Sequence, residues 1–236
     1  MTMHDVQHEH SDVTGGWLRP AVFGASDGLV SNFALIAGVA AGSSGSNSSK
    51  IVVLAGVAGL VAGAFSMAAG EYISVRSQSE QALAEIETER NEIAKRPQAE
   101  ERELAGMYVA KGLDPDLARE VARQLSRDPA VALDVHVREE LGLDLGALPS
   151  ATLAAGSSFV SFAIGAFLPL LPYLLGAEGL WPALVLTLAG LFLCGALVTR
   201  LTPRPWWYGG ARQVLIGAVA AAVTYGVGSL VDVGVS

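Results

Sequence analysis

Three polar side chains stand in sequence that is otherwise apolar, and their types could together hold a cation. Asp27 lies in SDGLVSNFALIAGVAAG, residues 26–42, while Met67 and Glu71 lie four residues apart in GAFSMAAGEYISV, residues 63–75. Residues four apart share one face of a helix, so the thioether and the second carboxylate point the same way. Two acids and a thioether could therefore line one route through the protein.

Each of these residues alone has a plainer interpretation. A carboxylate at membrane depth is expensive, so it normally faces a partner or a water-filled path. Asp27 could equally lie a turn or two inside the interface, where it reaches water or caps the following turn. A single methionine such as Met67 is more often packing material than a ligand. The presence of Glu71 beside Asp27 and Met67 favours a cation route over these separate structural roles.

Transmembrane helices must position these residues. A bilayer core of ~30 Å requires about 20 helical residues. Four uncharged runs are long enough, and a fifth is interrupted only by Asp27; they are Pro20–Gly42, Ile51–Gly70, Ser150–Ala177, Gly179–Thr199 and Gln213–Leu230. The sequence predicts an all-α polytopic membrane protein with five transmembrane helices.

Most charged residues lie between the second and third spans, and we refer to residues 76–148 as the acidic module. Pro97, Pro115 and Pro129 stand where helices should start or stop. We expect helices over Arg76–Ala94, Gln98–Lys111 and from Asp116 to Leu141 with a break near Pro129. The domain boundaries follow: a polar tail over 1–17, spans one and two over 18–75, the helical acidic module over 76–148, and spans three to five with a short tail over 149–236.

The acidic module offers a second group of candidate metal ligands. Carboxylates recur at helical spacing without lysines four residues later, and like charges so placed repel unless a cation lies between them. Carboxylates with one imidazole suit Fe²⁺ or Mn²⁺. A solvated acidic face is the plainer alternative. The candidates are Glu89, Glu92, Glu100, Glu103 and Glu140, followed by Glu85, His136 and Glu139.

The distribution of basic residues predicts the orientation. The connections at 43–50 and 173–181 carry one lysine and no arginine, whereas residues 200–212 carry three arginines and the acidic module begins at Arg76. The positive-inside rule then places the N-terminus and the acidic module in the cytoplasm and the C-terminus on the far side. The net charge of −8 argues against nucleic-acid binding. The N-terminal His4, His8 and His10 could bind metal only weakly.

The stretches SDGLVSNFALIAGVAAG, GAFSMAAGEYISV and FLPLLPY resemble the signature stretches of the vacuolar iron transporter family. The similarity runs from about Trp17 to Leu230 and includes the order of two spans, an acidic module and three spans. It implies a homodimer that exports Fe²⁺ or Mn²⁺ from the cytosol, with Co²⁺ and Zn²⁺ as further candidates, by proton antiport along a path between the two first helices. We expect a role in metal homeostasis and detoxification and no resident cofactor. We also expect no enzymatic activity, because an enzyme would need a nucleophile–base pair or an open metal site, and the glutamates lack the Glu-x-x-His pairing of di-iron bundles. The absence of a visible targeting segment suggests a bacterial member in the plasma membrane.

Carried over residue by residue, the resemblance assigns the pathway aspartate and methionine to Asp27 and Met67. It assigns module carboxylates to Glu89, Glu92, Glu100, Glu103 and Glu140. A pathway glutamate of plant members falls at Gly59 here, and Glu71 could substitute for it. The paired methionines of the plant module correspond to His136 and Val137. Loss of these soft ligands leaves the preference for iron over manganese open, since hard oxygen ligands also suit Mn²⁺. A membrane-anchored metal sensor or storage-linked protein is the alternative, and it would have no use for Asp27, Met67 and Glu71.

Overall fold

The structure is a computed structural model that describes residues 16–43, 48–199 and 204–231. These residues form helices and no strands, which confirms the all-α prediction. Five of the helices are long and apolar enough to cross a membrane. The chain divides into two compact units, one formed by residues 1–73 with 151–236 and the other by residues 74–150. We refer to the first as the membrane unit; the second contains the acidic module.

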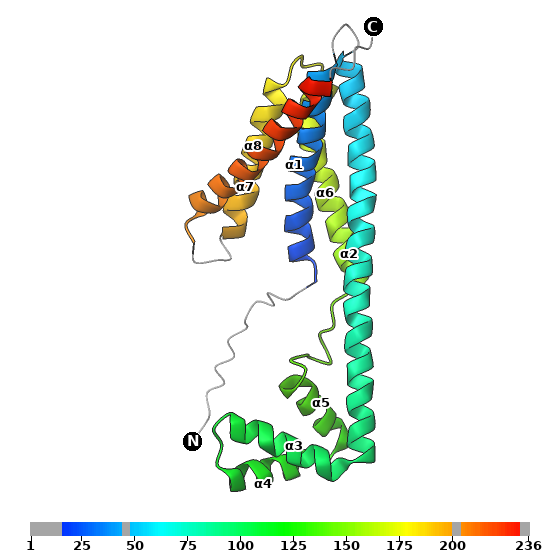
Figure 1. Cartoon of the computed structure of the whole chain (residues 1–236), viewed down its shortest axis with the longest axis vertical. Helices are drawn as coiled ribbons and strands as arrows, with labels where there is room; N and C mark the ends of the chain where they lie inside the picture. Colours follow the sequence, from blue (N-terminus) through cyan, green and yellow to red (C-terminus); the bar gives the residue numbers. More distant parts are fainter. Residues whose placement is uncertain (1–15, 44–47, 200–203, 232–236) are drawn as a thin grey trace, which may run out of the picture. The chain divides into compact units, whose positions relative to one another are not determined.

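In the membrane unit, α1 (Leu18–Gly42) packs against α6 (Ala151–Leu174), α7 (Trp181–Thr199) and α8 (Trp206–Val231) (Figure 1). Close approach of α1 and α6 depends on glycine. A Cβ atom at Gly28 would collide with the carbonyl oxygen of Phe162, and one at Gly165 would collide with that of Ala25. Small residues at such crossings let two backbones approach within van der Waals contact. This contact fixes which face of α1 is turned toward α6.

One helix, α2 (Ser48–Lys95), continues from the second span into the first helix of the acidic module. The sequence has no glycine or proline from Glu71 to Arg96, so nothing in it stops the helix at the expected boundary near residue 75. The span portion of α2 is sparsely covered by the other helices, because only 17% of its most apolar stretch is buried. Val52 and Ala64 are among the residues it contributes to the buried clusters of the unit.

The fifth span begins earlier than the sequence analysis placed it. Residues 201–212 were expected to form a connection, but α8 begins at Trp206 and includes Arg212. The carbonyl of Pro205 accepts a hydrogen bond from the backbone N–H of Tyr208 at 3.0 Å and so starts the first turn. The expectation was wrong because it took a charged residue as the helix boundary. An arginine near a helix end can extend its charged head toward the interface while its backbone stays helical.

The unit formed by residues 74–150 contains the C-terminal part of α2 with α3 (Pro97–Ala110), α4 (Pro115–Leu125) and α5 (Pro129–Glu139). Each of the three shorter helices begins with proline, as predicted, because proline is favourable in the first turn and unfavourable further in. Asp114 and Asp128 cap α4 and α5 by accepting backbone N–H groups at 2.9 Å. These caps and prolines set the register in which the acidic side chains meet.

Candidate metal sites

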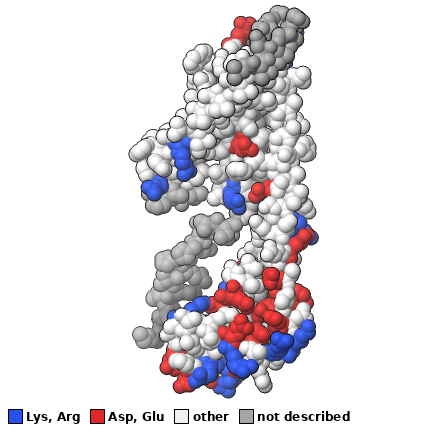
Figure 2. Space-filling view, viewed as in Figure 1, with Lys and Arg blue, Asp and Glu red and all other residues white. Residues whose placement is uncertain are grey.

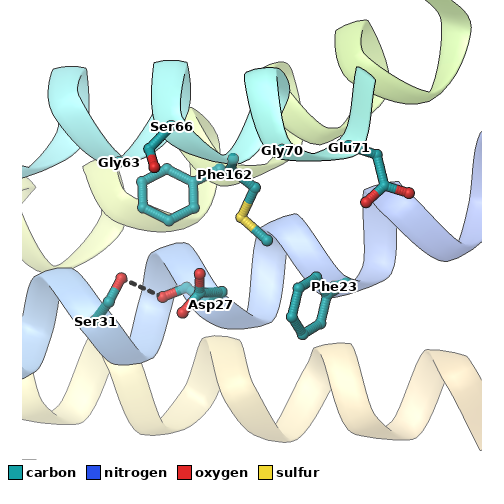
Figure 3. Close-up of a pocket in the computed structure, with 9 residues that line it drawn as sticks. Phe23, Asp27, Ser31, Gly63, Ser66, Gly70, Glu71 and Phe162 are labelled. Carbon is teal, nitrogen blue, oxygen red and sulfur yellow. Dashed lines mark hydrogen bonds between the residues drawn. The ribbon is translucent and has the colours of Figure 1, made fainter. Parts of the chain in front are cut away.

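A cavity of about 420 Å³ in the membrane unit is lined by Asp27, Met67 and Glu71. Asp27 comes from α1, whereas Met67 and Glu71 come from the same face of α2, as their spacing predicts. Figure 3 shows Asp27 and Glu71 on the two facing helices. The structure therefore brings the three candidate residues to one space. That they bind metal stays a prediction.

Neither carboxylate of this cavity forms an ion pair among the described residues, although Arg19 and Glu71 both line a neighbouring cavity. Carboxylates in a membrane span normally pair or coordinate a cation. A dication in the cavity would supply the missing positive charge.

Sequence reasoning missed several residues that line the same cavity, namely Phe23, Ser31, Gly63, Ser66, Gly70 and Phe162. The hydroxyl of Ser31 donates a hydrogen bond to the backbone carbonyl of Asp27, four residues earlier (Figure 3). A signal for it existed in the sequence, because a residue four after Asp27 shares its helix face. Phe162 lies more than 60 residues beyond the end of either helix, so no local pattern could have placed it.

In the acidic module, Glu89, Glu100 and His136 form a buried cluster. One ligand atom from each lies within 4.8 Å of the others. They come from α2, α3 and α5, respectively. Ile86 of α2 packs with Leu133 and Val137 of α5, and this apolar contact brings Glu89, one turn after Ile86, to His136. Figure 2 shows acidic side chains gathered over this part of the chain.

Three atoms of this cluster are buried without a hydrogen-bond partner among the described residues: Oε1 of Glu89 and both ring nitrogens of His136. Nδ1 of His136 lies 2.9 Å from Oε1 of Glu89, which is ion-pair distance, but the pair lacks hydrogen-bond geometry. Burial lowers the pKa of His136, although Glu140 and Glu103 oppose this shift. A neutral imidazole carries a free lone pair, which is the form that binds metal.

The pKa of Glu89 is raised from 4.5 to about 7, chiefly by burial and then by Glu140, Glu100, Glu92 and Glu103. The pKa of Glu100 is raised for the same kinds of reason. Buried carboxylates that are surrounded by further acids are typical of a site that a cation completes. Of the five carboxylates ranked highest in the sequence analysis, Glu89 and Glu100 are buried in the cluster, whereas Glu92, Glu103 and Glu140 are exposed and act on these two through their charge.

Of the remaining candidates in the acidic module, one lies in the buried cluster and two lie outside it. His136 lies in the cluster, although it was ranked below the five carboxylates. Glu139 forms an ion pair with Lys111, and Glu85 is exposed on α2 without being among the groups that raise the pKa of Glu89. His4, His8 and His10 lie outside the described residues.

Comparison with known proteins identifies the family of the chain. The profile of the VIT family matches residues 18–229. The chain is 33% identical to "Vacuolar iron transporter 1" of Arabidopsis thaliana, over 95% of this chain and 90% of the relative. It is 38% identical to "Vacuolar iron transporter" of Acanthamoeba castellanii, over 95% of this chain and 82% of the relative. The resemblance noted in the sequence is confirmed, and the chain, a multi-pass integral membrane protein, belongs to the VIT family.

Proposed function

We propose that this protein transports Fe²⁺ or Mn²⁺ across its membrane through the cavity between α1 and α2. The observation that carries the proposal is the meeting of Asp27, Met67 and Glu71 in that cavity, within helices that are apolar enough to cross a membrane. Oxygen ligands suit both ions, and a thioether adds affinity for the softer Fe²⁺. The relatives are named as iron transporters, which supports a metal ion as the substrate.

The acidic module would collect the ion. Glu89, Glu100 and His136 offer two oxygens and one nitrogen from three helices, and the surrounding carboxylates raise the local concentration of cations. A mixed set of this kind suits Mn²⁺ and Fe²⁺. The set belongs to the acidic module alone, so binding there can be measured separately from transport.

Direction, counter-ion and assembly are further parts of the proposal. The arginine bias supports a cytoplasmic acidic module, and a module that collects metal there would supply export from the cytosol. The family resemblance supports proton antiport and a homodimer, and a bacterial plasma membrane is the expected location. The relatives' names support a transporter rather than an enzyme. A sensor with a simple membrane anchor would leave the acidic cavity without a use.

Transport can be tested with the full-length protein in proteoliposomes. Uptake of Fe²⁺, Mn²⁺, Co²⁺ and Zn²⁺ would be measured with and without a pH gradient, with interior pH followed by a trapped dye. We expect uptake of Fe²⁺ and Mn²⁺ that is accelerated by an acidic interior and accompanied by proton movement. Protein-free vesicles matching the uptake of protein-containing vesicles for every metal would contradict the proposal.

Met67→Leu should reduce Fe²⁺ uptake about three- to tenfold more than Mn²⁺ uptake, because it keeps the side-chain volume but removes the soft sulfur ligand. Met67 also packs against the cluster of Ala64, Phe162 and Ala166, so a purely structural role is the competing explanation. Initial uptake rates for both metals would distinguish the two, with Met107→Leu in the acidic module as the control. Equal losses for Fe²⁺ and Mn²⁺ would assign Met67 to packing.

Metal binding by the acidic module should weaken as the pH falls. The metal-free module holds a proton on Glu89 up to a pKa of about 7, and Mn²⁺ must displace it. Between pH 7.5 and pH 6 we expect the affinity to fall about tenfold, since the ionised fraction of one such carboxyl falls by that factor. Calorimetric titration of full-length protein in buffers of different ionisation enthalpy would count the protons released. The Glu89→Gln variant should lose this proton release.

The raised pKa of Glu89 also predicts whether the stability of the module rises or falls with pH. The folded, metal-free module binds more protons than the unfolded chain between the ordinary pKa of 4.5 and about 7. Protonation of Glu89 therefore stabilises the module below pH 4.5, and this stabilisation is lost as the pH rises through 7. Melting temperatures that rise with pH across this window, in the presence of a chelator, would contradict the assignment.

A further inference from the structure

Asn32 of α1 is a buried polar residue of the membrane unit that the cavity between α1 and α2 does not include. It lies five residues after Asp27 and is 2% exposed. Its Nδ2 atom donates a hydrogen bond of 2.6 Å to the backbone carbonyl of Ala166 in α6. Only the amide nitrogen can face a carbonyl acceptor favourably, so this bond fixes the amide orientation and turns Oδ1 elsewhere.

The Oδ1 atom of Asn32 has no hydrogen-bond partner in the described part of the chain. A buried amide oxygen without a partner costs free energy relative to a satisfied one. A leucine in its place, next to Phe33 and Ala34, would avoid this cost. An unsatisfied polar group inside a span is thus expected to have a function.

Oδ1 is directed at Gly59 of α2, which has no side chain. A Cβ atom at Gly59 would lie 2.8 Å from Oδ1 of Asn32 and 2.5 Å from Cδ2 of Leu35, so this oxygen and this methyl group together occupy the place where a side chain would begin. Ser31 and Gly63 line the cavity that contains Asp27. Asn32 follows Ser31 on α1, and Gly59 lies one turn beyond Gly63 on α2. The oxygen is therefore the next polar atom along these two helices.

We propose that Oδ1 of Asn32 is a transient ligand that receives the divalent ion after it leaves the carboxylate of Asp27. The proposal rests on the proposed function, because it assumes that metal passes between α1 and α2. Amide oxygens are good ligands for hard divalent cations. A neutral oxygen binds a dication more weakly than a carboxylate, and a path works only if each site also releases its ion. Asn32 thus provides a second, weaker site.

The test compares Asn32→Ala with wild type in Mn²⁺ uptake by proteoliposomes, expressed per folded transporter. We expect the maximal rate to fall about tenfold with little change in the half-saturating concentration, because the Asp27 cavity still loads. Adding Gly59→Ser to Asn32→Ala should restore much of the rate, since a hydroxyl from α2 then enters the space left by the amide. The end of the Leu35 side chain, 2.5 Å from a Cβ at Gly59, must rotate aside, which its partial exposure allows. Thr187→Ala is the matched control: its buried hydroxyl bonds to Ala183 within α7.

The outcomes separate a ligand from a structural role. If Asn32 only fastens α1 to α6, an oxygen supplied from α2 cannot replace it, and the double variant would transport no better than Asn32→Ala. That result, or a wild-type rate in Asn32→Ala, overturns the proposal. If Asn32→Ala is not recovered folded, Asn32→Leu fills the volume and should show the same loss. Asp27→Ala run in parallel tests the proposed function itself, because retained transport there would reject the path and not only this ligand.

Discussion

Replacing Asp27 with alanine is expected to lower metal uptake at least about a hundredfold, a loss of about 2.7 kcal/mol in transition-state stabilisation. The carboxylate shares a cavity with Met67 and Glu71 and is not neutralised by an ion pair among the described residues. A dication that enters a low-dielectric span loses its water and needs anionic ligands in exchange. Without Asp27, the ion would have to lose its water before it reaches an anionic ligand on α1.

The same substitution should leave the fold intact. Asp27 is partly exposed to the cavity, and removing a carboxylate from a span relieves a desolvation cost instead of a packing contact. We therefore expect a melting temperature at or above that of wild type and an unchanged gel-filtration profile. Asp27→Asn, which keeps the shape, should lose transport in the same way.

Glu178→Ala is a suitable control, because it removes an acid from the α6–α7 connection outside the spans. It should transport at the wild-type rate. Near wild-type uptake by Asp27→Ala, with the control equally active, would show that metal does not depend on the cavity between α1 and α2.

The sequence predicted the elements well where a single physical rule dominates. Uncharged runs of membrane length identified the spans, and Pro97, Pro115 and Pro129 located the starts of α3 to α5. The failure at Trp206 shows the limit of this approach. A helix ends where its backbone hydrogen bonds end, and charge patterning does not report on these directly.

The candidate site was predictable in part, for a similar reason. Spacing along one helix placed Met67 and Glu71 on a common face, but the atoms opposite a residue depend on the rotation of neighbouring helices. Contact between Gly28 and the backbone of α6 sets that rotation for α1, and it directs Asn32 at Ala166 and Gly59. His136 likewise meets Glu89 only because α5 packs on α2. Contacts of this kind carry no local sequence signal.

The acidic module supplies the second large effect. In full-length Asp27→Ala protein, where the membrane cavity is disabled, Mn²⁺ at a hundred times its dissociation constant should stabilise the module by about 2.7 kcal/mol. For a domain of this size, that is a rise in melting temperature of roughly 10–20 °C. The physical source is the buried cluster of Glu89, Glu100 and His136, whose unpartnered atoms and repelling carboxylates a cation would satisfy.

Changing Glu89 and Glu100 together to glutamine should abolish the Mn²⁺-dependent shift. It should also raise the melting temperature of the metal-free protein near neutral pH, because two buried carboxylates that repel each other have been neutralised. A general acidic surface would not behave in this way, since bulk charge attracts cations whichever glutamates carry it.

The matched control is the pair Glu87→Gln and Glu101→Gln, which removes the same charge from the same two helices but leaves the cluster unchanged. Glu87 is exposed and pairs with Arg90. Differential scanning fluorimetry of the three proteins, with and without Mn²⁺, compares them directly. If the cluster variant and the control shift by the same amount, then the module is only a solvated acidic face. If the control shifts like the unmodified module while the cluster variant does not, the metal is bound where α2, α3 and α5 meet.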